Sequence, residues 1–362
     1  MQSSTETAVL ITMIGVKHLE KKLGDFTLEG INLSVKEGEY FCILGPTGSG
    51  KTILLETIAG IYNPDAGSII INGDEVSSLL PKDRKISMVY QDFMLFPNMN
   101  VRKNIAFGLN YNSFQGLEKA IIAEKVKETA ELLGIYHLLE RDPSTLSGGE
   151  KQRTAIARAI ITEPKLLLLD EPLSALDTGT KGRLRQELLR IHKLKKTTTI
   201  HVTHSFEEAF TLADRIAIMH GGKIHQIGSP DEVFRKPNSR FVADFVGVEN
   251  LFHGKAVVKD DLAEIYVNGL KIISSILRSG DVSVSIRPED ILISKNPIYS
   301  SATNAFTGTL TEISRMRSTV KLVIDAGIPF RVVLTKRAYD DMELSIGADV
   351  YLTFKASATH II

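Results

Sequence analysis

A glycine-rich run, GPTGSGKT, combines small residues with one lysine and one terminal hydroxyl. It follows the apolar run EYFCIL and precedes ILLETIAGI, in which the apolar residues have the spacing of a helix. Glycines between a strand and a helix let successive N–H groups face the oxygens of a phosphate. We therefore expect a phosphate-binding loop made by Gly45, Pro46, Thr47, Gly48, Ser49, Gly50, Lys51 and Thr52.

Two acidic residues end a second apolar run, LLLLDEP, which is typical of a central parallel strand buried on both faces. Acids often end strands, so this run alone does not indicate a catalytic site. It does so only together with the phosphate loop. With that loop present, Asp170 and the hydroxyl of Thr52 are expected to hold Mg²⁺. Glu171 is expected to polarise an attacking water as general base, and Lys51 to reach the β- and γ-phosphates.

Two more polar residues follow strand-like runs. Gln91 comes after ISMVY, where its amide could sense Mg²⁺ or the attacking water. His204 ends TIHVTH, where its imidazole could contact the γ-phosphate, although a lone histidine there also fits an ordinary surface residue. His201, His220 and His225 are paired with no site by the sequence.

A third glycine-containing run, TLSGGEKQR, begins a helix. Ser147 can cap it, and Gly148 and Gly149 leave bare N–H groups at its N-terminus, which favours an anion. A capped surface helix would explain the same residues. Because this run has no phosphate-loop lysine of its own, the charge that accompanies the anion must come from elsewhere. Glu150 adds a carboxylate close to that position.

The bulk composition is that of a soluble globular protein. Of the 362 residues, 43% are hydrophobic and 24% charged, and the formal net charge is zero, which gives no support to nucleic-acid binding. The single cysteine, Cys42, lies in an apolar run and is expected to be a buried thiol in a reducing compartment. No stretch has the apolar length of a membrane span, and AVLITMIGV near the start is better explained as a first strand than as a secretion signal.

Strands and helices alternate over the first two thirds of the chain, which favours an α/β fold with a mostly parallel sheet. The expected strands include INLSV, EYFCIL, GSIIING, LLLLD and TTTIHVTH, and RIAIMHGGKIHQIG is expected to be a hairpin. We assign residues 8–245 to a nucleotide-binding domain, with a helical subdomain at about residues 92–160.

Strand signals dominate after residue 246, and an internal repeat appears. NLFHG at residues 250–254 matches NAFTG at residues 304–308, and two glycine turns feed similar strands from Gly280 and Gly347. Coincidence would also explain so short a match. We expect residues 246–362 to form an all-β domain of two related OB-like barrels.

In their order and spacing, these motifs resemble those of the ABC-transporter ATPase subunits. The resemblance covers residues 13–245 and rests on GPTGSGKT, Gln91, LSGGE, LLLLDEP, SALD and His204. It implies ATP as the nucleotide and a homodimer in which Ser147, Gly148, Gly149 and Glu150 face the ATP of the other subunit. It also implies that Asp177 lies at the dimer seam.

The segment YQDFMLFPNMNVRKNIAFGL further resembles importer ATPases of the sulfate, maltose and molybdate type. This implies transmembrane permease subunits and an extracytoplasmic solute-binding protein as partners, and a peripheral position at the cytoplasmic face of the membrane. Two residues depart from the family pattern. Glu150 stands where the family usually has Gln, and Leu23 aligns with the aromatic that stacks on adenine, a role that Phe26 could take.

The C-terminal part resembles the molybdate-binding β-barrel domains of the MOP and TOBE type. The matching runs are SATNAFTG, VVLTKR and TFKASATHI, with Thr303 where the family often has arginine. A tetrahedral dianion needs a positive charge with hydroxyl and N–H donors. The resemblance implies an oxyanion site made by Ser301, Thr303, Thr335, Lys355 and Ser357. An ordinary β-barrel accessory domain is the alternative.

Together these features predict the ATP-hydrolysing subunit of an importer for molybdate or tungstate, whose C-terminal domain senses the oxyanion. Alternatives in the same class are importers of sulfate, iron, polyamine or sugar. A soluble ABC ATPase acting on DNA or ribosomes, or an oxyanion sensor with an inactive ATPase, are alternatives of other classes. The retained Lys51, Asp170 and Glu171 disfavour the inactive sensor.

Overall fold

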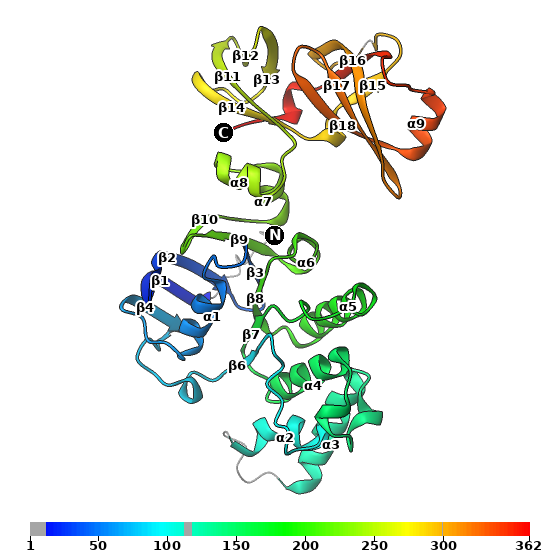
Figure 1. The fold of residues 1–362 in the computed structure, drawn as a ribbon. Helices are drawn as coiled ribbons and strands as arrows, with labels where there is room; N and C mark the ends of the chain where they lie inside the picture. The colour runs from blue at the N-terminus through cyan, green and yellow to red at the C-terminus, as the bar shows by residue number, and fades with distance from the viewer. Residues whose placement is uncertain (1–11, 112–117, 299) are drawn as a thin grey trace, which may run out of the picture. The chain divides into compact units, whose positions relative to one another are not determined.

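The computed structural model describes residues 12–111, 118–298 and 300–362 (Figure 1). Residues 8–11 of the expected first strand lie outside the described residues. The chain forms two compact units, residues 1–230 and 231–362. The change of composition near residue 246 falls within the second unit, because two short helices precede its sheets.

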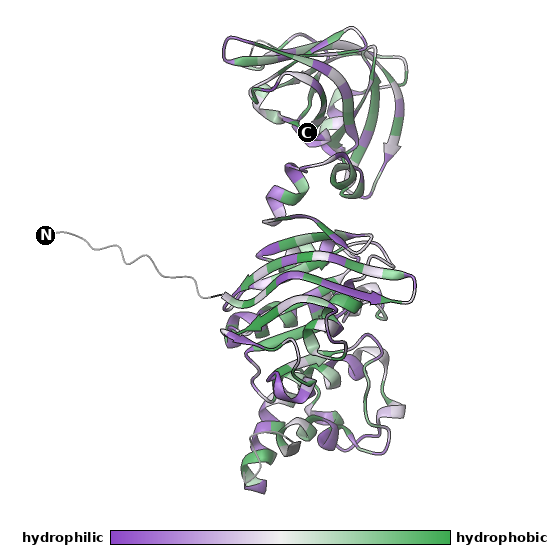
Figure 2. Ribbon diagram, turned by 90° about the vertical axis from the view of Figure 1, so that its left-hand side faces the viewer, coloured by the Kyte–Doolittle hydropathy of each residue, from purple (hydrophilic) through white to green (hydrophobic). Residues whose placement is uncertain are grey.

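The first unit contains a four-stranded antiparallel sheet in the order β2-β1-β4-β5. Alternate side chains of β2 are buried, as expected for a sheet with one face on a core, and Figure 2 shows hydrophilic and hydrophobic bands alternating along the long strands. The strands are β1 (Thr12–Leu23), β2 (Phe26–Lys36), β4 (Ala66–Ile71) and β5 (Asp74–Glu75).

A six-stranded sheet in the order β10-β9-β3-β8-β7-β6 forms the centre of this unit, and all its strands except the edge strand β10 are parallel. The predicted Gly-Gly hairpin is confirmed, because Gly221 and Gly222 both have positive φ between β9 and β10. The strands are β3 (Tyr40–Leu44), β6 (Ile86–Val89), β7 (Leu166–Asp170), β8 (Thr198–Thr203), β9 (Arg215–His220) and β10 (Lys223–Gly228).

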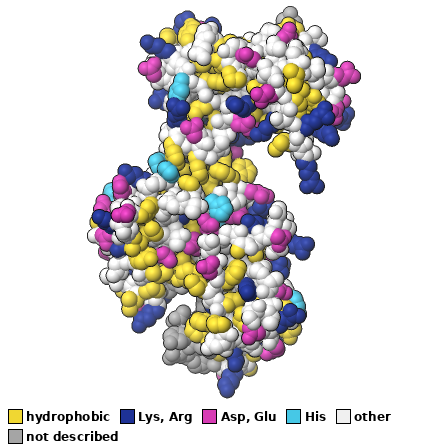
Figure 3. Space-filling model, viewed as in Figure 1, with side chains coloured by type: hydrophobic (Ala, Val, Ile, Leu, Met, Phe, Trp, Pro, Cys, Tyr) yellow, Lys and Arg dark blue, Asp and Glu magenta, His cyan; other side chains and the backbone are white. Residues whose placement is uncertain are grey.

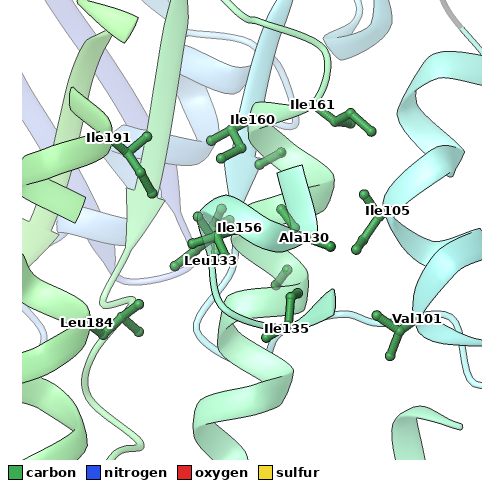
Figure 4. Close-up of a cluster of buried hydrophobic side chains, with 14 of the residues drawn as sticks. Val101, Ile105, Ala130, Leu133, Ile135, Ile156, Ile160, Ile161, Leu184 and Ile191 are labelled. Atoms are coloured by element: carbon green, nitrogen blue, oxygen red, sulfur yellow. The ribbon is translucent and has the colours of Figure 1, made fainter. Parts of the chain in front are cut away.

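Helices cover both faces of this sheet, so the predicted α/β fold is confirmed. Leu166 and Leu168 of β7 share a core with α1, whereas Leu167 and Leu169 share one with α2, α3, α4 and α5 (Figure 4). Cys42 is fully buried in β3, as predicted. The helices are α1 (Lys51–Ala59), α2 (Val101–Tyr111), α3 (Lys119–Leu132), α4 (Gly148–Ile160), α5 (Thr178–Lys195) and α6 (Phe206–Leu212).

After α7 (Pro230–Arg235) and α8 (Arg240–Phe245), the described residues form two five-stranded sheets and one α-helix, and the two sheets confirm the repeat. Their strand orders are β13-β12-β11-β14-β20 and, read from the other edge, β18-β17-β16-β19-β15, so equivalent strands occupy equivalent places. In each sheet one edge strand, β20 or β15, comes from the other half of the repeat. The first half contains β11 (Asn250–Lys259), β12 (Leu262–Val267), β13 (Leu270–Ser274), β14 (Gly280–Ile286) and β15 (Leu292–Ser294). The second contains β16 (Asn304–Arg315), β17 (Thr319–Asp325), β18 (Pro329–Thr335), α9 (Lys336–Met342), β19 (Asp349–Phe354) and β20 (Thr359–Ile361).

The repeated asparagines join the two halves reciprocally. Asn250 bonds the backbone N–H and C=O of Arg331 in β18, and Asn304 bonds the N–H and C=O of Ile273 in β13. Both side chains are buried, at 0% and 1% exposed, and a buried amide is stable only when it is paired. The asparagine of each N-x-F-x-G run therefore holds its half of the repeat to a strand of the other half.

Charges of both signs are interspersed on the face shown in Figure 3. No helix within the described residues is long and apolar enough to cross a membrane.

Candidate functional site

Strand order brings the predicted site residues together. β3, β8 and β7 are parallel neighbours, so their carboxyl ends lie at one edge of the sheet. The phosphate loop follows β3, Asp170 ends β7 and His204 follows β8. Ligands of open parallel sheets bind at this edge.

Lys51 lies folded back onto the phosphate loop. Its ammonium donates to the carbonyls of Gly45 and Pro46, at 2.9 and 3.0 Å, and lies 3.8 Å from the carboxylate of Glu171. The side chain is 5% exposed. Burial lowers the pKa of Lys51, an effect that the carboxylates of Glu171 and Asp170 oppose. A partly desolvated ammonium is therefore available to a phosphate.

The loop fits a phosphate in two further ways. The hydroxyl of Ser49 is buried and has no hydrogen-bond partner within the described residues. A Cβ on Gly45 would lie 2.1 Å from the carbonyl oxygen of Met219, and one on Gly50 would lie 2.5 Å from the ring of Phe26. The loop thus requires glycine where the backbone is tightest and has a donor that lacks a partner. Phe26, the alternative adenine-stacking residue, is half-buried against this loop, and Leu23 pairs with it in a hairpin.

Thr52 and Asp170 form the oxygen pair expected for Mg²⁺. The hydroxyl of Thr52 donates to Asp170 Oδ1 at 3.1 Å, and Asp170 is 4% exposed. Burial raises the pKa of Asp170, although the hydrogen bond from Thr52 opposes it. Mg²⁺ commonly binds one or two carboxylates together with substrate phosphates and water. The described residues contain no cluster of three or more His, Cys, Asp or Glu side chains suited to a metal.

Glu171 is held by its backbone and by His204. Its φ of +41° lies in the left-handed region, which costs a non-glycine residue free energy and is often found at functional sites. Its N–H donates to the carbonyl of Val202 in β8, and its carboxylate lies 3.0 Å from His204 Nδ1. The carboxylate is 16% exposed and the imidazole 51%. Glu171 is therefore oriented from both sides.

The run TLSGGEKQR, hereafter the signature run, begins α4 with a complete capping box. The hydroxyl of Ser147 accepts from the N–H of Glu150 at 3.4 Å, and the Glu150 carboxylate accepts from the N–H and hydroxyl of Ser147 at 2.8 and 2.9 Å. These bonds, the backbone one first, lower the pKa of Glu150. Glu150 is thus an ionised capping residue, and the hydroxyl of Ser147 donates its hydrogen bond to this carboxylate. No contact among the described residues joins this run to the phosphate loop.

The SALD turn adjoins the signature run. Asp177 caps α5 by accepting from the N–H groups of Gly179 and Thr180. A Cβ on Gly149 would come 2.9 Å from Thr180, so α5 approaches the signature glycines closely. Asp177 is exposed and has a cap role in addition to any role at a dimer seam.

Gln91 is exposed after β6, and the segment that follows it is anchored by α4. Phe93 and Met94 have positive φ, and the guanidinium of Arg158 donates to their carbonyls at 3.1 and 2.6 Å. The same guanidinium lies over the ring of Phe96. The sequence analysis missed Arg158, because nothing in a helical run indicates a contact with a loop about 65 residues earlier.

A buried polar chain behind His204 was also missed. The hydroxyl of Tyr40 lies 2.9 Å from His201 Nδ1, and Glu208 lies beyond His201. The sequence offered a weak signal, since Glu208 stands three residues after the helix-capping Ser205.

The predicted oxyanion residues fall into two places. Asn304 of β16 pairs with Phe354 of the antiparallel strand β19. Thr303 and Lys355 are the next residues beyond this pair, and Ser301 and Ser357 lie two residues further along each segment. Lys355 is exposed. Thr335 ends β18, which β17 separates from β16, and its hydroxyl caps α9. Within one chain, the structure does not bring Thr335 beside the other four residues.

Comparisons with known proteins identify the family of this chain. The ABC transporter family matches residues 28–174, and the TOBE domain family matches residues 300–361. The molybdate/tungstate import ATP-binding protein of Pyrococcus abyssi is 44% identical over 350 residues, which are 96% of this chain and 100% of the relative. That of Pyrococcus horikoshii is 45% identical over 350 residues, covering 96% and 99%. A spermidine/putrescine import ATP-binding protein of Bacteroides thetaiotaomicron is 37% identical, covering 97% and 73%.

Solved structures resemble the first unit. A dimeric ATP-binding cassette in a post-hydrolysis state, bound to ADP and phosphate, matches with a TM-score of 0.56 and 29% identity, covering 60% of this chain and 99% of that chain. A component of an ABC transporter complex from Clostridium perfringens matches with a TM-score of 0.56 and 30% identity, covering 62% and 91%. The predicted family and ATPase activity are confirmed: the chain belongs to the ABC-transporter ATPases, in the family of the molybdate/tungstate import ATP-binding proteins.

Proposed function

We propose that the protein hydrolyses ATP to energise the import of molybdate or tungstate through a membrane transporter. The observation that carries the proposal is the convergence of Lys51, Glu171 and His204 at one sheet edge, in a chain that is 44% identical to a molybdate/tungstate import ATP-binding protein over that relative's whole length. We assign residues 8–245 to the ATPase and residues 246–362 to regulation.

The geometry supports a division of roles. Lys51 leaves the carbonyls of Gly45 and Pro46 to bind the β- and γ-phosphates, and Glu171 accepts the proton of the attacking water. His204 Nδ1 faces Glu171, so in this proposal Nε2 on the opposite edge of the ring would contact the γ-phosphate. Thr52, Asp170 and Gln91 would hold Mg²⁺, which would supply positive charge to neutralise the phosphates.

A homodimer completes the site in this proposal. The N–H groups of Gly148 and Gly149 and the hydroxyl of Ser147 begin α4 and would bind the γ-phosphate held by the partner's phosphate loop. The dimeric state of the similar cassette supports this arrangement. Asp177 would lie at the seam.

Membrane permease subunits are the proposed partners at a groove beside α2 and α4. The groove has a volume of about 740 Å³, and its wall includes Met94, Leu95, Phe96 and Phe107. Met94 is 56% exposed, although it is large and apolar. An apolar groove rimmed by polar residues is typical of a helix-binding site. Such binding places the protein at the cytoplasmic face of the membrane, opposite an extracytoplasmic solute-binding protein.

An oxyanion at the second unit would restrain hydrolysis when the cell is replete. The proposal rests on the pairing of Asn304 with Phe354, next to Thr303 and Lys355, and on the resemblance that Ser301 and Ser357 share with them. These four residues would supply three hydroxyls and one ammonium. Calorimetry of the full chain with molybdate, tungstate and sulfate tests it. Binding that Lys355→Ala abolishes and Lys295→Ala leaves intact would support the site. Equal ATPase rates of the reconstituted transporter with and without millimolar molybdate or tungstate would refute the regulation.

Glu171→Gln tests the ATPase site. The amide keeps the shape of the side chain but cannot take a proton, so we expect turnover to fall by about 10²–10⁴-fold while ATP binding remains. Glu128→Gln, on the exposed surface of α3, is the matched control. Unchanged turnover of Glu171→Gln would refute the assignment. Uptake of labelled molybdate, tungstate, sulfate and spermidine by the reconstituted transporter would then identify the solute.

A further inference from the structure

The residues directly before and after His204 are joined to each other and to Glu208 by hydrogen bonds. The hydroxyl of Thr203, the residue before it, donates to Glu208 Oε2 at 2.7 Å. The same hydroxyl oxygen accepts the N–H of Ser205, the residue after it, at 3.0 Å. The hydroxyl of Ser205 in turn accepts the N–H of Glu208 at 3.3 Å. The backbone at both sides of His204 is therefore fixed by the hydroxyls of Thr203 and Ser205 together with Glu208.

The carboxylate of Glu208 is buried and ionised. Its residue is 6% exposed, and burial alone would raise its pKa. The opposing effects of His201 and Thr203 outweigh burial, so the pKa of Glu208 lies below its ordinary value. A hydroxyl that donates to an ionised carboxylate makes a strong, short hydrogen bond. The bond from Thr203 is therefore a firm anchor for α6.

The anchor is itself held by the sheet. His201 Nε2 lies 3.5 Å from the Glu208 carboxylate, and His201 Nδ1 lies 2.9 Å from the hydroxyl of Tyr40. Tyr40 begins β3, the strand that leads to the phosphate loop, and both Tyr40 and His201 are buried. The buried chain thus links the start of β3, the end of β8 and the start of α6.

We propose that Thr203 and Glu208 are positioning residues for hydrolysis, which hold the His204 imidazole at the Glu171 carboxylate. The inference rests on the proposed role of His204. Small displacements of a reacting group can cost about 10²-fold in rate. His204 is half exposed and has one described contact with Glu171, at 3.0 Å, so its placement depends on the backbone around it.

Thr203→Val tests the proposal, because valine keeps the shape and removes the hydroxyl. We expect kcat to fall by about tenfold or more, with the KM for ATP changed by less than about twofold. Thr203→Ser, which keeps the hydroxyl, should restore kcat. Thr199→Val is the matched control, since Thr199 is buried in the same strand but its hydroxyl donates to the carbonyl of Thr197.

The decisive measurement repeats Thr203→Val in the His204→Ala background. If Thr203 acts through His204, its loss should have no further effect there. An equal loss of kcat in both backgrounds, or an unchanged kcat in the first, would overturn the proposal. If Thr203→Val does not fold, kcat of Glu208→Gln is measured in the native and His204→Ala backgrounds instead. A loss of kcat only in the native background supports the proposal, and an equal loss in both or no loss in the first overturns it. A His204→Ala variant with full turnover would refute the role of His204 itself, whereas a defective His204→Ala beside a normal Thr203→Val would refute only the positioning role.

Discussion

Replacing Glu150 separates its two effects on the signature helix. Its carboxylate accepts two hydrogen bonds from Ser147, and its charge lies at the positive end of α4. Glu150→Ala removes both effects, and loss of a cap costs about 1 kcal/mol. Glu150→Gln keeps an acceptor oxygen and removes only the charge, which is worth about 0.3–1 kcal/mol at low salt.

Hydrogen exchange of the first turn of α4 measures this locally. Under conditions where exchange follows the opening equilibrium, about 1 kcal/mol corresponds to about fivefold faster exchange for Glu150→Ala. Glu150→Gln should give a smaller increase that salt removes. Because the pKa of Glu150 is lowered in the folded state, its stabilisation is present above the ordinary carboxyl pKa and is lost as pH falls through the folded pKa. The difference between the native protein and Glu150→Gln should therefore vanish in acid.

The same variants test the effect of Glu150 on catalysis. If α4 faces a γ-phosphate, removing the negative charge in Glu150→Gln should lower the KM for ATP by about two- to fivefold, as expected for a partly screened charge. Glu124→Gln, on the exposed surface of α3, controls for net charge. Equal exchange in Glu150→Ala and the native protein, or identical behaviour of Glu150→Ala and Glu150→Gln, would refute the capping argument. A KM unaffected by Glu150→Gln would refute the electrostatic one.

Four further variants probe the scaffold. Asn304→Ala leaves the N–H and C=O of Ile273 unpaired and should lower the free energy of unfolding by about 2–3 kcal/mol, seen as a lower thermal midpoint, with Asn250→Ala behaving alike. Arg158→Gln should keep the ATPase of the isolated protein while weakening its stimulation by solute in the reconstituted transporter, because the loop after Gln91 loses its anchor. Arg84→Met removes four bonds to buried or partly buried carbonyls, two of them at the end of α1, and should destabilise the protein by about 2 kcal/mol or more in denaturant unfolding.

Local patterns predicted much of the first unit. The continuous apolar runs became the buried strands β3 and β7, since burial on both faces removes the alternation of a half-exposed strand. β8 is also buried along its length, although four of its six residues are Thr or His. The capping residues Ser147 and Asp177 begin helices as expected. In the second unit, the short N-x-F-x-G match predicted the repeat, although it could not show that the asparagines would bond the opposite half.

Residue types and their spacing along the chain were enough to predict the phosphate loop, the acids at the end of β7 and the family. The groups that meet in space could be found only from the folded chain. Strand order placed Glu171 beside both Lys51 and His204. It also buried Glu208 where it accepts a hydrogen bond from Thr203 and lies 3.5 Å from His201. The fold also brings Arg158 to the loop at Met94, where it donates a hydrogen bond. It places Thr335 and Lys355 at the ends of strands that are not neighbours in the sheet. The physical reason is that hydrogen bonds and ion pairs form between groups close in space, whereas sequence patterns report only neighbours within a strand or helix.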